Sequence, residues 1–497
     1  MELQFQNKPL DCLRSVLCGV KSQEQTQEVK LPEAMPDVAK VLGAWGQCVL
    51  RGKEWHTGRM GASGGVMVWV LYAPEDGTFP RVVETWIPYQ LQWELPQTQR
   101  DGTIVIQPLL KGVDARAVSA RKLMVRACVE ALGEAMEPIK IDTYLPEALP
   151  DDIYLLRKKY PVCIPVEAGE KTFTLEEELQ LPQDCSAAGK LIHYALYPQI
   201  REQKLVGTRL LFRGTAILQG LCRDSDNSLR SFSMEIPFSQ YAEPEKEWDD
   251  ASVQVIPAVT NLELDLLDTG KILLKASMVG QYLICHRKLL EVVEDAYSPG
   301  AKVQLQVQPL QLPAMLEMIS QSLEAEVSQE LPVQDVIDAA FSIGQPEQHR
   351  NDSGMQVQLF GSFQVLYRDQ EATLQSASVK WEHSQQIPMD SSAKLCGAVL
   401  PVGSPVCAQT GNGIHLQNEA AMTQKVFSTE EIPMVVGLAI TPENSNSERP
   451  SLILRRPGDH TLWEIAKEYG STETAIRQAN GLSEEPAPDR ILLIPVV

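Results

Sequence analysis

One pentapeptide has the residue types of a hydrolase nucleophile. The sequence GASGG at residues 61–65 matches the pattern Gly-x-Ser-x-Gly, in which a strained turn lifts a serine out of a strand. That chemistry needs an apolar strand before the motif and a helix after it. Here the polar stretch 55–59 precedes the motif and a strand-like run follows it. We therefore predict a flexible loop at 61–65 and no catalytic serine.

A second stretch has part of a calcium-binding loop. Asp224, Asp226 and Ser228 alternate as oxygen ligands, and Glu235 stands at the twelfth position. The sixth position of such a loop must be glycine for its sharp turn, but here it is Leu229. We predict a solvated hairpin turn instead.

The histidines do not have the spacing of a metal site. None of them forms an HxxxH or HExxH pair, and the glycines at 61–65 lack the following Gly-Lys of a phosphate loop. We therefore predict no metal, no cofactor and no catalytic residue. The seven residues are His56, His193, His286, His349, His383, His415 and His460.

Three blocks of sequence recur in the same order along the chain. The dipeptide Leu-Pro occurs at residues 31, 181 and 331, at intervals of 150 residues. A second, longer block aligns without gaps and begins at Val70, Gly220 and Val365. A third block begins at Arg121, Gly270 and Asn412. Self-similarity at a fixed period indicates tandem modules. We predict modules at 1–150, 151–300 and 301–442, the third being the most divergent.

The repeated blocks favour strands. Short β-branched and aromatic runs flank polar turns such as Glu75-Asp76-Gly77, which is typical of hairpins. Helical periodicity in the modules is limited to 313–340 and 36–42. We predict a mainly β chain of three antiparallel modules, sandwich-like or barrel-like.

The tail differs from the modules. Residues 443–450 are polar and rich in breakers, which predicts a linker before a domain at 451–497. Thr461 with Glu464 forms a capping-box pattern, and Gly470 ends the first helix. A second helix and two flanking strands complete a βααβ pattern, in which Trp463 belongs to the core.

The tail resembles LysM domains. The family pattern is matched by Gly458-Asp459, the run TLWEIA at 461–466, Asn480 and the closing sequence LIP at 493–495. The resemblance implies a groove between two loops that takes N-acetylglucosamine-containing glycan or a protein partner. His460 is a one-residue insertion in the first loop and argues against glycan. The groove residues implied are Gly458, Asp459, His460, Thr461, Leu462, Asn480, Gly481 and Leu482.

The modules resemble SPOCS repeats. LPEAMPDVAKVL from residue 31 and RKLMVRA from residue 121 carry the likeness, together with the order of three repeats and a terminal LysM domain. This is the architecture of SipL-type spore-coat assembly proteins. It implies a role in the mother-cell cytosol at the forespore surface, where the LysM domain contacts a SpoIVA-type scaffold ATPase.

Charge and targeting signals limit the partners. The net charge is −21, with the deficit greatest between residues 151 and 450, so nucleic acid and anionic membrane surfaces are excluded. No apolar run is long enough to span a membrane, and the N-terminus has no export signal. We therefore expect a cytoplasmic protein whose ten cysteines are buried thiols rather than bridges.

These features together predict a non-enzymatic coat assembly protein whose LysM domain binds a coat scaffold. The alternative is a LysM protein that binds peptidoglycan. An enzyme hidden in the modules is a further alternative, and it requires a polar cluster at equivalent sites of the repeats.

Overall fold

The computed structural model describes residues 1–96, 101–182, 190–224, 227–267, 270–411, 413–442, 450–484, 486 and 490–496. Of the predicted linker 443–450, all but Pro450 lies outside the described residues, as do Ser225, Asp226 and Asn412. The predicted mainly β class is confirmed: the described chain consists of antiparallel strands, and its helices occur in a small C-terminal domain.

Residues 6–145 form two three-stranded antiparallel sheets. The strands are β2 (Gln6–Lys30), β3 (Val38–His56), β4 (Arg59–Pro74), β5 (Arg81–Glu94), β6 (Thr103–Ser119) and β7 (Lys122–Leu145). The sheet orders are β2-β7-β6 and β3-β4-β5. Along β5, Ile87, Tyr89 and Leu91 are buried while the residues between them are exposed. This alternation places a core on one face of the sheet.

Residues 154–297 repeat the arrangement. The strands are β8 (Tyr154–Gln180), β9 (Lys190–Val206), β10 (Arg209–Arg223), β11 (Leu229–Ala242), β12 (Ala251–Leu266) and β13 (Lys271–Tyr297). They form sheets of order β12-β13-β8 and β11-β10-β9. The predicted hairpin turn at 224–228 joins β10 to β11, and its described part includes Asn227 with φ 67°.

Residues 301–442 form the third pair of sheets. The strands are β14 (Ala301–Glu330), β15 (Val333–Ile343), β16 (Glu347–Asn351), β17 (Gly354–Asp369), β18 (Leu374–Ile387), β19 (Lys394–Thr410) and β20 (Gly413–Pro442). Strand β20 pairs with β14 and β19, and β17 pairs with β15, β16 and β18. The N-terminal strand β1 (Glu2–Gln4) also pairs with β20, which brings the start of the chain to the third module.

The recurring sequence blocks occupy equivalent places in the three modules. Each Leu-Pro dipeptide directly follows the first long strand, β2, β8 or β14. The second block covers the hairpins β4–β5, β10–β11 and β17–β18. The predicted boundaries at 150 and 300 fall between β7 and β8 and between β13 and β14.

Three local predictions were wrong. Residues 313–340 are strand in β14 and β15 apart from 331–332, and 38–42 begin β3, because pairing with neighbouring strands overrides helical periodicity. The GASGG motif is part of β4 rather than a loop. Its glycines make room for aromatic rings: a Cβ on Gly64 would lie 2.5 Å from the Tyr89 hydroxyl, and one on Gly65 2.2 Å from the Trp86 ring.

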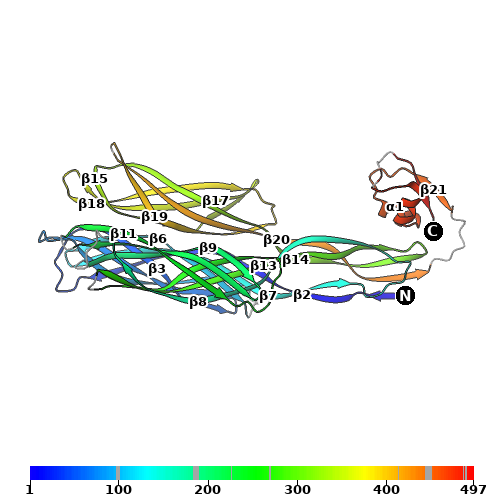
Figure 1. The fold of residues 1–497 in the computed structure, drawn as a ribbon, viewed down its shortest axis with the longest axis horizontal. Helices are drawn as coiled ribbons and strands as arrows, with labels where there is room; N and C mark the ends of the chain where they lie inside the picture. The colour runs from blue at the N-terminus through cyan, green and yellow to red at the C-terminus, as the bar shows by residue number, and fades with distance from the viewer. Residues whose placement is uncertain are drawn as a thin grey trace.

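The outer ends of the long strands pack together as three antiparallel strand pairs, and we call this extension the stalk. Each module supplies one strand pair: β2 with β7, β8 with β13, and β14 with β20. Figure 1 shows these strands extending beyond the sheets toward the N-terminus and the C-terminal domain. The apolar residues buried there are Cys12, Ile141, Val162, Ile164, Leu290, Val292, Leu310, Leu312, Ile432 and Met434.

Buried polar contacts join the modules. The Lys425 ammonium pairs with the Glu134 carboxylate, and both side chains are almost fully buried. The Gln281 side chain bonds both backbone groups of Ile106, at 2.9 and 2.7 Å. Because these buried polar groups pair across module boundaries, they favour one relative placement of the modules.

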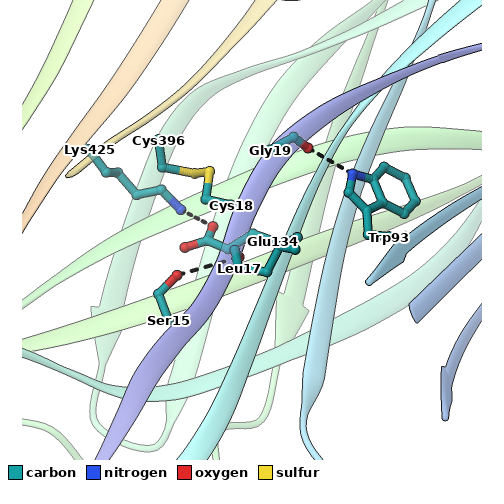
Figure 2. Close-up of a disulfide and its surroundings, with 8 residues drawn as sticks. All are labelled: Ser15, Leu17, Cys18, Gly19, Trp93, Glu134, Cys396 and Lys425. Atoms are coloured by element: carbon teal, nitrogen blue, oxygen red, sulfur yellow. Dashed lines mark hydrogen bonds and ion pairs between the residues drawn. A yellow bond between two sulfur atoms is a disulfide. The ribbon is translucent and has the colours of Figure 1, made fainter. Parts of the chain in front are cut away.

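A disulfide joins Cys18 on β2 to Cys396 on β19, 378 residues apart (Figure 2). The bridge lies beside the Lys425–Glu134 pair and links the first module to the third. The expectation that every cysteine is a free thiol was therefore wrong. Scattered spacing carries no information about pairing between modules, and disulfides are typical of oxidising surroundings.

Candidate binding site of the C-terminal domain

The C-terminal domain has the predicted βααβ order. Its elements are β21 (Leu452–Arg455), α1 (Leu462–Tyr469), α2 (Glu473–Asn480) and β22 (Leu492–Pro495), with β21 and β22 antiparallel. Ile465, Ile476 and Ile494 are completely buried between the helices and the sheet. This core holds two loops in place, one before α1 and one after α2.

The first loop presents exposed residues next to a helix start. Gly458 has φ +58°, and Asp459 and His460 are exposed. Thr461 caps α1, since its hydroxyl accepts a bond from the Glu464 backbone N–H at 3.2 Å. The Glu464 carboxylate accepts bonds from the backbone N–H and hydroxyl of Thr461, which hold its pKa below the usual value.

The second loop is held in place by the side-chain amide of Asn480. The Asn480 side chain donates to the backbone carbonyls of Ile476 and Leu493 at 2.8 and 2.6 Å and accepts from the Leu493 N–H at 2.8 Å. Gly481 follows with φ +59° as the left-handed end of α2. Asn480 therefore ties α2 to β22, and its amide is engaged inside the domain.

The eight predicted groove residues thus separate into three groups. Leu462 is completely buried and Leu482 packs against the same core, so both side chains support the domain rather than face a partner. Thr461 and Asn480 are engaged in capping and in tying the strand. The other four are exposed on the loops, as Thr461 also is: Gly458, Asp459, His460 and Gly481.

The domain docks on the end of the stalk through α1. The indole N–H of Trp463 donates to the Asp295 carboxylate at 2.9 Å, and the Lys467 ammonium lies 2.7 Å from the same carboxylate. The Tyr297 hydroxyl donates to the Ser471 carbonyl at 3.0 Å. Trp463 is therefore a core residue, as predicted, and also an interdomain contact.

Aromatic packing reinforces this contact. The rings of Tyr297 and Trp463 meet edge to face with centroids 4.7 Å apart, and Tyr154 stacks on Tyr297 at 5.5 Å. Burial in this packing raises the pKa of Tyr297, so its hydroxyl stays a donor. Sequence reasoning missed Asp295 and Tyr297, because nothing local indicates that Asp295 contacts Trp463, 168 positions further along the chain.

A second candidate site lies between the modules. A cavity of about 160 Å³ is lined by residues of all three modules. At its wall His193 bonds Asp338 at 2.9 Å, and the His193 ring stacks on Trp45 with centroids 4.5 Å apart. Both side chains are buried and join the second module to the third. The pair therefore acts as an interface contact, in keeping with the structural role predicted for the histidines.

Among the residues that the structure describes, no group of three or more His, Cys, Asp or Glu side chains is placed to hold a metal ion. The helices found in this part of the chain are too short and too polar to cross a membrane.

A family model identifies the C-terminal domain. The LysM domain model matches residues 456–495, which cover α1, α2 and β22 and all eight predicted groove residues. Comparison with curated proteins finds no match to the chain. The chain therefore carries a LysM domain, a class that binds peptidoglycan glycan or protein, at the end of a β-rich body.

Proposed function

We propose that this chain is a non-enzymatic spore-coat assembly protein whose LysM domain binds a SpoIVA-type coat scaffold ATPase at the forespore surface. The three modules are SPOCS-like repeats in this proposal, and the chain works on the mother-cell side, where the Cys18–Cys396 bridge is an exception to the usual reduced state of cytosolic cysteines. The observation that carries the proposal is the position of the LysM domain. It is docked at the end of the stalk by Trp463 and Asp295, and its loops remain exposed.

This placement suits a binding head on a rigid body. The contacts of Asp295 and Tyr297 hold α1 against the stalk, so the domain presents its loops in one orientation. A pre-oriented site loses less freedom on binding than a freely tethered one. The body beneath carries most of the net charge of −21, which supports solubility rather than nucleic-acid contact.

Glycan binding is the second candidate, and the LysM family match favours it. A sugar is recognised through free hydrogen-bonding groups. The Thr461 hydroxyl and the Asn480 amide are already engaged, and His460 lies 3.8 Å from the Glu464 carboxylate. These contacts support a protein partner over a glycan.

Two parallel binding measurements test the proposal. The purified full chain is immobilised for scaffold ATPase binding, and the same preparation is mixed with purified peptidoglycan. Replacing Asp459 and His460 together with alanine should weaken scaffold binding about tenfold or more, since hot-spot contacts are of that size. Asp352→Ala, an exposed substitution in the third module, is the matched control. Strong retention on peptidoglycan with no scaffold binding would contradict the proposal.

Localisation gives an independent test in a sporulating host. Removal of residues 451–497 should abolish the forespore localisation of a fluorescent fusion. Unchanged localisation would assign recruitment to the modules.

A further inference from the structure

The outer face of the LysM sheet is apolar and open to solvent. Leu452 and Leu454 of β21 are 52% and 66% exposed, and Leu493 of β22 is 37% exposed. Leu454 pairs with Leu493, and Leu452 pairs with Pro495. Since successive strand residues point to opposite faces, these four lie on one side of the sheet. Ile491 continues the same alternation and is 57% exposed. These five residues are called the outer sheet face.

This face has no structural task within the domain. The opposite side of the sheet supplies Ile453, Leu492 and Ile494 to the core. The docking contact with the stalk uses α1 instead, through Trp463 and Lys467. Four of the thirteen large hydrophobic side chains that are exposed in the described chain belong to this small domain. A contiguous exposed apolar patch marks an interaction surface, whereas scattered ones do not.

The charges around the face select the partner. Arg456 follows the same alternation as Leu452 and Leu454 and is exposed. Arg490 is one residue out of the alternation of Ile491 and Leu493, and its guanidinium donates to the Asn480 carbonyl at 2.9 Å, so it does not belong to the face. Arg455 points to the other side, where it pairs with Glu468 and lies 3.0 Å from the Tyr469 hydroxyl. Neither strand contains a carboxylate. The face is thus apolar with a cationic end, which complements apolar side chains flanked by carboxylates.

The remaining charge disfavours other occupants. A chain of net charge −21 is repelled by anionic lipid and by a second copy of itself. An amphipathic helix presents an apolar stripe bordered by charged side chains, and laying that stripe on an exposed apolar surface is a recurring mode of recognition. We infer that the outer sheet face docks an amphipathic helix of the coat scaffold. The apolar stripe of that helix packs against Leu454 and Leu493, and a carboxylate beside the stripe pairs with Arg456.

This inference rests on the proposed function and adds a second contact surface to it. Leu454→Ser with Leu493→Ser tests the face in the full chain, because both side chains are exposed and the core is left intact. Leu289→Ser is the matched control, since Leu289 is 65% exposed on β13. Circular dichroism and thermal melting check that each variant folds.

The probe is the purified scaffold ATPase, measured by biolayer interferometry in 50 and 300 mM NaCl. The double serine variant should bind at least tenfold more weakly, and Leu289→Ser should bind as the parent chain does. Arg456→Glu should weaken binding about threefold to tenfold in low salt and flatten its salt dependence.

Four results would overturn the inference. If the double serine variant binds the scaffold within twofold of the parent affinity, the outer sheet face is not part of the contact, but the proposed function still holds. No scaffold binding by the parent chain removes both. The parent chain is also mixed with vesicles of phosphatidylcholine containing 30% phosphatidylglycerol and run in sedimentation velocity. Vesicle binding that the double serine variant loses would assign the face to a membrane. A dimer that the double serine variant loses would assign it to a second copy of the chain.

Discussion

The indole N–H of Trp463 in the LysM domain donates a 2.9 Å hydrogen bond to the carboxylate of Asp295 at the end of the second module. Lys467 approaches the same carboxylate, and Tyr297 packs edge to face on Trp463. One carboxylate thus receives an indole and an ammonium from α1. This contact makes the LysM domain part of the body rather than a freely tethered appendage.

Replacement of Asp295 with alanine should undock the LysM domain without unfolding it. Two charge-assisted contacts are lost, which corresponds to about 1–3 kcal/mol of docking free energy. Hydrogen–deuterium exchange should then increase in α1 and in the last residues of strand β13. Glu317→Ala, an exposed substitution on β14, serves as the control. Unaltered exchange in both segments would contradict the docking contact.

The buried ion pair between the first and third modules gives a second prediction. Lys425→Met leaves the Glu134 carboxylate buried beside an apolar group, because the Glu134 side chain is only 1% exposed. The free energy of unfolding should fall by about 3–5 kcal/mol. Adding Glu134→Leu should restore most of the loss, as measured by guanidinium unfolding. A double variant no more stable than the single one would show that the pair is not the cause.

The disulfide should stabilise the contact between the same two modules. Cys18→Ser should lower the free energy of unfolding by about 2–5 kcal/mol under oxidising conditions and have no effect under reducing ones. In unfolded but unreduced protein, Cys18 and Cys396 should resist iodoacetamide. Full labelling of both, read by mass spectrometry of the purified chain, would show that the bridge is absent.

Cys163 should be the most reactive of the partly exposed thiols. Interaction with the neighbouring Cys285 thiol is the main cause that lowers the pKa of Cys163 to about 6, whereas burial raises that of Cys407 to about 11. The thiolate of Cys163 is thus present above pH 6 and lost below it. Its alkylation rate should fall between pH 7 and pH 5 after correction for solvent effects, and Cys285→Ala should move this fall to higher pH. Equal rates at Cys163 and Cys407 at pH 7 would contradict the shift.

Short-range patterns in the sequence predicted the features that depend on neighbouring residues. The capping box of Thr461 and Glu464 and the left-handed end at Gly470 are observed, because helix ends are decided within one turn. The hairpin at Glu75-Asp76-Gly77 also follows from local turn chemistry, and Gly77 has φ +65°.

Long-range features were not predictable from the same patterns. Residues 313–330 have helical spacing, yet they extend as strand because β14 pairs with β20 along nearly its whole length. The Cys18–Cys396 bridge and the contact of Asp295 with Trp463 join residues 378 and 168 positions apart. Neither has a local signal, so only the assembled fold brings these side chains together.

The sequence prediction of the groove was limited for a related reason. A family pattern contains both the residues that build a domain and those that face a ligand. Leu462 and Asn480 belong to the first group, since one is completely buried and the other bonds β22. The side chains of Asp459 and His460 are exposed, so among the predicted groove residues these are the ones that a partner can contact.

The most direct test of the central claim is the affinity of the purified full chain for the SpoIVA-type scaffold ATPase, measured beside its retention on peptidoglycan. We predict saturable scaffold binding that the double substitution of Asp459 and His460 with alanine weakens about tenfold or more, whereas Asp352→Ala binds as the parent chain does. We predict no retention of the parent chain on peptidoglycan. Retention on peptidoglycan that the same double substitution removes, with no scaffold binding, would contradict the claim.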